Sequence, residues 1–191
     1  MQKPLNFAFV LPDRLAGMAH PDRFSRLEDQ LDYLQANHIS AVLSVCMSGL
    51  DKEKLKAHNF IYLHEPIPDF AAPPLARLSQ LVNWVDQQIQ AGRGVVVHCG
   101  AGFGRTGTIL TAYFLTKDPS LSAYQALNQV RKLRPGSVES LEQEITLYNY
   151  ARVLKRPLGP LTQRLRQHSD LELLEYGLAP DCYLPSQDFR E

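Results

Sequence analysis

Residues 95–108 read VVVHCGAGFGRTGT, and this stretch decides the prediction of the fold. Val95–Val97 carry the β-branched side chains of a short buried strand, and the apolar residues that follow the stretch are typical of a helix packed in a core. Between them lies a loop that begins with Cys99, ends with Arg105 and holds three glycines. The sequence therefore predicts a strand, a glycine-rich loop and a helix in direct succession.

The composition of this loop predicts a phosphate-binding site. Three glycines allow successive backbone amides to turn inward as a concave set of N–H donors, and the positive end of the next helix adds to their field. Arg105 offers a planar fork that can hold two phosphate oxygens at once. The expected phosphate-binding residues are Gly100, Ala101, Gly102, Phe103, Gly104 and Arg105.

Cys99 is the expected nucleophile of this loop. The surrounding amides and the arginine favour a thiolate at neutral pH. A sulfur below a bound phosphate can attack phosphorus in line and form a covalent thiophosphate, which water then hydrolyses. A dinucleotide motif fits poorly because its first glycine comes too late and its acidic partner is missing, and a Walker loop fails because Lys-Ser or Lys-Thr is absent. The remaining alternative is a buried thiol beside an ordinary turn.

A leaving alkoxide or phenoxide needs a proton, and Asp69 is the candidate acid. It follows an expected strand, as Cys99 does, and ligands of open α/β sheets bind where the carboxyl ends of strands converge. The prolines around Asp69 stiffen its loop, although a solvated loop aspartate is the alternative. Thr106 is expected to donate its hydroxyl to Cys99, to cap the helix, or to do both. His98 is expected to support the loop structurally.

The wider pattern alternates strands and helices, which predicts an α/β domain with a central, mostly parallel, twisted sheet flanked by helices. The opening strand is expected at 6–10, and its end is marked by Pro12. The other expected strands are 39–45, 60–64 and 95–97. The expected helices are 21–37, 51–58, 75–90, 108–115, 122–134 and 140–154, with short helical pieces at 161–167 and 170–176.

The 191 residues fit one catalytic domain, expected at 1–154, followed by a C-terminal extension at 155–191 that is rich in proline.

Twenty basic and twenty acidic side chains give a net charge of zero, so no global field favours nucleic acid or an anionic membrane. No segment resembles a signal peptide or a membrane span. We expect a cytoplasmic protein, monomeric, with neither a nucleic-acid nor a membrane partner.

The three cysteines show neither a CxxC pair nor a Cys/His cluster with zinc spacing. Reduced thiols are therefore expected. Cys46 ends a strand that is expected to neighbour the catalytic loop. It is either a core thiol or the partner of a reversible disulfide with Cys99. Cys182 lies in the extension and receives no role.

These residues resemble a known family. The stretch His98–Thr108 is similar to the signature loop of cysteine-dependent protein phosphatases, and the chain as a whole resembles the small atypical dual-specificity phosphatases of the VHZ type over about residues 6–152. Further similar pieces are Asn6-Phe7, Leu11-Pro12, Arg14–Gly17, Ile67–Phe70, Leu133–Ser137, Glu139 and Glu142–Glu144.

The resemblance implies a phosphomonoesterase that needs neither metal nor cofactor. Cys99 is then the nucleophile, Arg105 the phosphate clamp, Asp69 the acid and later the base, and Thr106 the hydroxyl helper. Glu139 is a candidate second carboxylate of the site, with a surface or helix-capping position as the alternative. Gln143 is left outside the catalytic set, although it too can border the site.

The expected substrate is a phosphorylated protein or peptide that carries phosphotyrosine, with phosphoserine and phosphothreonine as further candidates. The loop has no lysine at positions 100–104, which favours a singly phosphorylated, partly apolar substrate. Two alternatives stay open: a phosphoinositide or RNA 5′-phosphatase of the same fold, and a catalytically silent phosphopeptide-binding module.

Overall fold

The structure is a computed structural model that describes residues 2–23 and 25–179. Five strands in this part of the chain form one sheet in the order β1-β2-β5-β3-β4. The strand β1 (Ala8–Leu11) runs antiparallel to β2, and all other neighbours are parallel. The remaining strands are β2 (Leu15–Met18), β3 (Ile39–Ser44), β4 (Ile61–His64) and β5 (Gly94–His98). The predicted α/β class with a mostly parallel sheet is confirmed.

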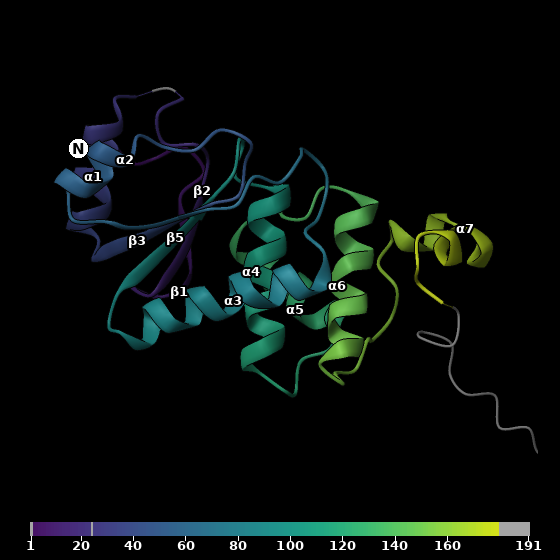
Figure 1. Ribbon diagram of the computed structural model, residues 1–191. Helices are drawn as coiled ribbons and strands as arrows, with labels where there is room; N and C mark the ends of the chain where they lie inside the picture. The colour runs from purple at the N-terminus through teal and green to yellow at the C-terminus, as the bar shows by residue number, and fades with distance from the viewer. Residues whose placement is uncertain (1, 24, 180–191) are drawn as a thin grey trace, which may run out of the picture.

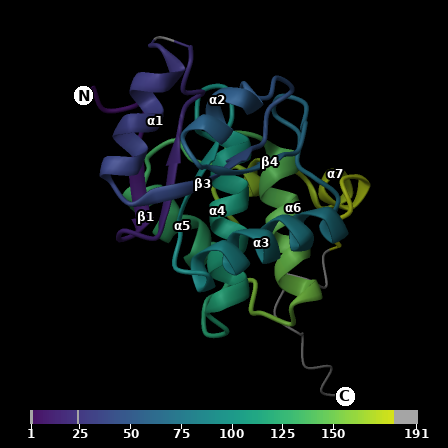
Figure 2. The same cartoon turned by 60° about the vertical axis from the view of Figure 1, so that its left-hand side comes forward.

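Helices cover both faces of this sheet (Figures 1 and 2). One face carries α1 (Leu27–Ala36) and α2 (Lys52–Ala57). The other carries α3 (Leu75–Gln90), α4 (Gly104–Lys117), α5 (Ala123–Leu133) and α6 (Leu141–Val153), while the one-turn η1 (Leu165–Gln167) and α7 (Asp170–Glu175) lie beyond α6. Each sheet face therefore has its own apolar cluster, and the larger one surrounds α4.

Local sequence explains where several helices begin. Asp51 accepts hydrogen bonds from two amides of the first turn of α2. Ser122 with Gln125, and Ser140 with Gln143, form reciprocal capping boxes at the starts of α5 and α6. The helix α4 differs, because every residue from Gly104 to Leu115 is buried and its N-cap residue, Phe103, offers no side-chain cap.

Three elements differ clearly from their prediction. The helix expected at 108–115 begins at Gly104, so Arg105 lies in its first turn and not at the end of the loop. The helix expected at 21–37 begins only at Leu27; before it, the amide of His20 donates to Gly100 O and the amide of Arg23 closes a turn with His20 O. The strand β2 was not expected at all. Its Leu-Ala-Gly-Met sequence has little β propensity and no alternation, yet all four residues are buried between β1 and β5. Its pairing partners stabilise it, and its own sequence does not.

The expected extension packs on the larger cluster as far as it is described. Leu165, Leu173 and Leu178 are buried in that cluster. Tyr148 of α6 donates a hydrogen bond to the carbonyl of Pro160 at 2.6 Å. Residues 155–179 therefore share a core with the residues before them. No helix in the described residues is long and apolar enough to span a membrane.

Candidate active site

The catalytic loop runs from Cys99 to Phe103 and joins the C-terminal end of β5 to the first residue of α4. Cys99 is 2% exposed at the base of this loop. Cys46, which follows β3, lies near it, and both are free thiols. Parallel pairing of β3 with β5 brings these two strand ends to the same edge of the sheet. Cys99 and Cys46 therefore lie at this edge of the sheet.

The carbonyl groups of the loop are bonded on its outer side. The amide of His20 donates to Gly100 O at 3.0 Å, and Asn6 Nδ2 donates to Ala101 O at 3.1 Å and to Gly102 O at 3.2 Å. Phe103 O accepts the amide of Gly107 inside α4. Since the N–H of each following residue points opposite to such a carbonyl, the loop amides face the other way, as a phosphate site requires.

Arg134 is the main support behind the loop. Its guanidinium is buried and donates to the carbonyls of Asn6, Gly17 and Gly102. Burial lowers the pKa of Arg134 to about 10, which still leaves it charged at neutral pH. Gly17 is required in β2 because a Cβ there would lie 2.8 Å from Arg134 Cζ. The resemblance included Arg134 and Asn6 but gave neither a role, since only the fold brings them to the loop.

Arg105 and Asp69 meet across the site. Arg105 Nη2 donates to Asp69 Oδ1 at 2.7 Å, and Arg105 Nη1 donates to the carbonyl of Ile67 at 2.8 Å. The arginine is 7% exposed, whereas the Asp69 side chain is 65% exposed. An exposed carboxylate can leave this pair for water or substrate at small cost. The two predicted residues are therefore neighbours, and the pair is open to replacement by a phosphate.

The loop that carries Asp69 is fastened to the start of α6. Ser140 Oγ donates to Phe70 O, and Gln143 Nε2 donates to Ala71 O at 3.2 Å. Glu142 Oε1 accepts the amide of Ala72 at 3.0 Å. These bonds, together with the prolines, limit the movement of Asp69. Gln143, which was left outside the catalytic set, is buried here as a link between the two loops.

Glu139 stands at the beginning of α4. Its Oε2 accepts the amide of Gly104 at 2.7 Å, and its own amide donates to Gln143 Oε1 at 2.8 Å. The partial positive charge of a helix N-terminus favours such a carboxylate. A Cβ at Gly104 would lie 2.7 Å from Glu139 Oε2, so the carboxylate would have to shift to make room for it. A side-chain carboxylate therefore holds one of the amides that the sequence assigns to phosphate.

Thr106 is fully buried in the first turn of α4. Its hydroxyl has no hydrogen-bond partner among the described residues, so neither the expected bond to Cys99 nor a helix cap is formed in this structure. A buried hydroxyl without a partner is rare and marks a position where a group is free to accept or donate. The role of Thr106 toward the sulfur stays a prediction.

His98 and Cys46 lie behind the loop. Nε2 of His98 shares a short hydrogen bond with Ser44 Oγ, and burial lowers the pKa of this histidine to about 3. Its ring is therefore neutral and fixes the end of β5, as the sequence predicts. Burial, with the charge of Cys99 as a second cause, raises the pKa of the Cys46 thiol.

A thiol, an arginine fork and inward amides at the carboxyl end of a parallel sheet define the class of cysteine-dependent phosphatases. The comparisons with known proteins agree. The family model described as "Polymorphic toxin system, DSP-PTPase phosphatase" matches residues 16–118, which is more than half of the chain. The chain belongs to this family of DSP-PTPase phosphatases. The matched residues include Asp69, Cys99 and Arg105.

Individual relatives match at about a quarter identity. The tyrosine-protein phosphatase cdc-14 of Caenorhabditis elegans is 26% identical over 147 residues, which are 72% of this chain and 20% of that protein. Cyclin-dependent kinase inhibitor 3 of Sus scrofa is 26% identical over 71% of this chain and 66% of its own length. The chain thus spans a fifth to two thirds of these relatives.

Among solved structures, the crystal structure of Tk-PTP in its active form superimposes with a TM-score of 0.69 at 30% identity. The alignment covers 77% of this chain and 97% of that one. This likeness supports the α/β fold and the family membership together.

Proposed function

We propose that the protein is a phosphatase that hydrolyses phosphotyrosine, and secondarily phosphoserine and phosphothreonine, in proteins or peptides. The observation that carries this proposal is the arrangement around Cys99: loop carbonyls bonded outward, amides facing inward, and Arg105 beside them. Such a site holds three oxygens of a phosphate with its phosphorus above the sulfur. The family supports phosphatase chemistry, and the small atypical dual-specificity class is our finer assignment within it.

The reaction follows from the geometry in two steps. The Cys99 thiolate attacks phosphorus as the bond to the leaving oxygen breaks, and Asp69 donates a proton to that oxygen. Water then attacks the thiophosphate, Asp69 takes its proton, and the sulfur leaves as a thiolate while phosphate is released. A bound phosphate competes with Asp69 for Arg105, and this exchange frees the carboxyl group for proton transfer.

An aromatic substrate is favoured by the rim of the site. Phe70 follows Asp69 and is 57% exposed, so it offers an apolar surface where a leaving phenol would lie. The chain has a net charge of zero and no lysine in the loop, which supports a singly phosphorylated substrate over a polyanionic one. A cytoplasmic, monomeric protein is part of the same proposal.

The test is hydrolysis of an aryl phosphate in the presence of EDTA across acidic to slightly alkaline pH. We expect turnover with an acidic optimum, its abolition in Cys99→Ser, and a loss of about 10²–10⁴-fold on the basic limb in Asp69→Asn. Phosphotyrosine, phosphoserine and phosphoinositide substrates are then ranked by kcat/KM.

Three outcomes contradict the proposal. Activity that survives in Cys99→Ser means that the nucleophile is wrong. A wild type that binds phosphopeptide without turnover is a binding module. A phosphoinositide or an RNA 5′-phosphate preferred over phosphotyrosine assigns a different substrate class.

A further inference from the structure

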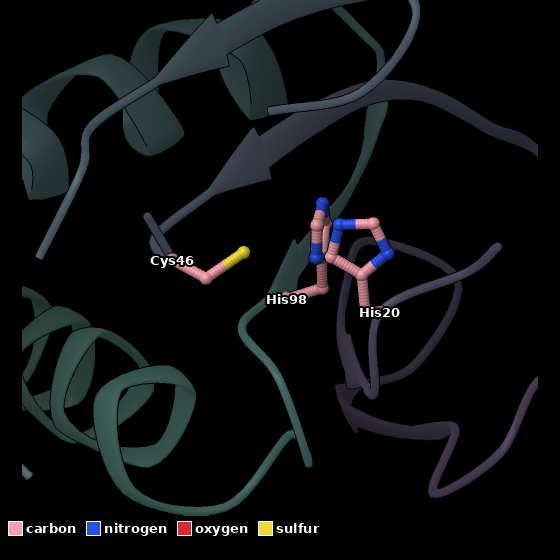
Figure 3. A group of neighbouring side chains, drawn as sticks. All are labelled: His20, Cys46 and His98. Atoms are coloured by element: carbon pink, nitrogen blue, oxygen red, sulfur yellow. The ribbon is translucent and has the colours of Figure 1, made fainter. Parts of the chain in front are cut away.

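Three side chains from distant parts of the chain meet behind the catalytic loop. His20 follows β2, Cys46 follows β3, and His98 ends β5. One ligand atom from each lies within 4.8 Å of the other two. Figure 3 shows the Cys46 sulfur directed toward the two rings, which meet edge to face with centroids 5.0 Å apart. We propose that His20, Cys46 and His98 form a binding site for one soft divalent cation, with Zn²⁺ as the best fit.

The strongest argument for a cation site is the unpaired ring nitrogen of His20. Its Nδ1 pairs with Asp22 Oδ1 at 2.5 Å, which leaves Nε2 to face the group. This Nε2 is buried and has no hydrogen-bond partner among the described residues, although buried ring nitrogens are normally bonded. A carboxylate on the far nitrogen of a histidine is also the usual support of a metal ligand, because it sets the tautomer and raises the basicity of the ring.

His98 can supply its second nitrogen. Nε2 is engaged with Ser44 Oγ, and Nδ1 donates a long hydrogen bond of 3.4 Å to the carbonyl of Cys99, which a bound cation would replace. When Nε2 donates its proton to Ser44, Nδ1 carries a lone pair and can bind a cation. The ring is fully buried, so it is held in place for binding.

Cys46 completes the donor set. Its Sγ donates to Ser48 O at 3.1 Å, so it is a thiol here, and binding of the cation replaces the S–H proton, which is released to solvent. One thiolate and two imidazoles are the ligands that Zn²⁺ prefers over Mg²⁺ or Ca²⁺. Ligand atoms around a tetrahedral Zn²⁺ lie about 3.5 Å apart, so the group closes on the ion with shifts of about 1 Å. A fourth position stays open.

The site is coupled to the catalytic loop through its ligands. His98 is bonded covalently to Cys99, and the backbone amide of His20 donates to Gly100 O at 3.0 Å. A bound ion thus fixes both chain segments behind the nucleophile and places positive charge near its sulfur. We expect Zn²⁺ to slow turnover from this position, without contact between the ion and the substrate.

Zinc binding by the full-length Cys99→Ser protein tests the site independently of activity. Competition with a chromophoric chelator is expected to show one Zn²⁺ per chain, and Co²⁺ is expected to give a thiolate-to-cobalt charge-transfer band. Adding Cys46→Ser or His20→Gln to this background lowers the affinity by at least about 100-fold, and Asp22→Asn lowers it by about 10–100-fold. Melting curves without metal verify that each variant is folded.

Matched controls separate this site from its neighbours. His64→Gln changes a histidine that contacts the Cys46 carbonyl but lies outside the group, and Cys182→Ser removes another thiol. Both are expected to keep the ion. Zn²⁺ binding that disappears in Cys99→Ser yet persists in Cys46→Ser assigns the metal to the nucleophile and overturns the proposal. An affinity weaker than millimolar, or a loss in Cys182→Ser, overturns it as well.

Zinc inhibition of the active enzyme gives a second readout. Each variant is compared with its own rate without metal. We expect Cys46→Ser to need at least about 100-fold more free Zn²⁺ for half-inhibition than the wild type. Equal sensitivity of the two proteins contradicts the proposed link between the ion and the loop.

Discussion

Among the single residues of the site, two carboxylates bind the groups that are expected to bind phosphate. Asp69 pairs with the Arg105 guanidinium, and Glu139 accepts the amide of Gly104. A phosphate dianion that enters the loop meets both negative charges. Asp69 is exposed and can turn away as the acid. Glu139 is held on its backbone side by Gln143, so its charge stays near the anion.

Glu139→Gln is therefore expected to tighten binding of inorganic phosphate by about 5–10-fold, because removal of one nearby charge is worth about 1 kcal/mol. The inhibition constant of phosphate against an aryl phosphate measures it, and Glu53→Gln on α2 controls for net charge. A fall in kcat by about 10²-fold or more with unchanged phosphate binding would instead make Glu139 a second catalytic carboxylate, as the resemblance suggests.

Tyr113 is expected to make the free energy of unfolding depend on pH in the alkaline range. Burial and the nearby Asp86 raise its pKa to about 12, above the ordinary value of 10. The unfolded chain loses this proton first as pH rises, so the free energy of unfolding falls between about pH 10 and pH 12. Tyr113→Phe is expected to remove about 2 kcal/mol of this fall. Denaturant titrations at pH 9 and pH 11.5 measure it, and the exposed Tyr176→Phe should behave as wild type.

At the scale of elements, the catalytic loop depends on segments that contribute no chemistry. Asn6 precedes β1 and Arg134 follows α5, and both donate to loop carbonyls, while the carbonyl of Gly17 in β2 accepts from Arg134. A loop with inward amides has outward carbonyls, and these need donors when they are buried. The N-terminal strands therefore orient the phosphate site from behind.

Arg134→Met is expected to lower the free energy of unfolding by about 3–5 kcal/mol, because it removes three charge-assisted hydrogen bonds to backbone carbonyls. Asn6→Ala removes bonds nearer to the surface and is expected to cost at most about 1 kcal/mol while kcat/KM falls about 10-fold. Chemical denaturation and steady-state kinetics of both variants separate the two effects. An Arg134→Met protein with unchanged stability would show that its bonds are dispensable.

At the scale of the whole molecule, residues beyond α6 complete the core. The buried carboxylate of Glu144 in α6 is bonded by Arg131 of α5 and by Arg164 and Thr162 of the extension. A buried charge of this kind is stable only while its partners remain. The larger apolar cluster likewise includes Leu165, which lies on the one-turn η1.

Leu165→Ala is expected to destabilise the protein by about 2–5 kcal/mol, since it leaves a cavity in a shared core. Leu171→Ala, at a side chain that is 67% exposed in α7, is the matched control and should change stability by at most about 0.5 kcal/mol. Thermal melting of the two variants decides it. Equal and small effects would mean that residues beyond 155 are only loosely attached.

The sequence by itself determined the catalytic loop and the class of fold. Cys99, the glycines and Arg105 are contiguous, so their chemistry follows from local spacing, and the alternation of apolar runs is enough to predict an α/β sheet. Asp69 could also be predicted as a site residue from the sequence, because the carboxyl ends of parallel strands meet at one edge of the sheet.

Only the tertiary structure decided which distant groups serve that loop. The strand β2 has no sequence signal of its own, and α1 begins six residues later than its apolar spacing predicts. Three sets of contacts join residues that are far apart in the chain. Arg134 donates to the loop carbonyl of Gly102, and Glu139 accepts the amide of Gly104. His20, Cys46 and His98 form the third set. Such contacts arise from packing, and no local periodicity or propensity encodes them.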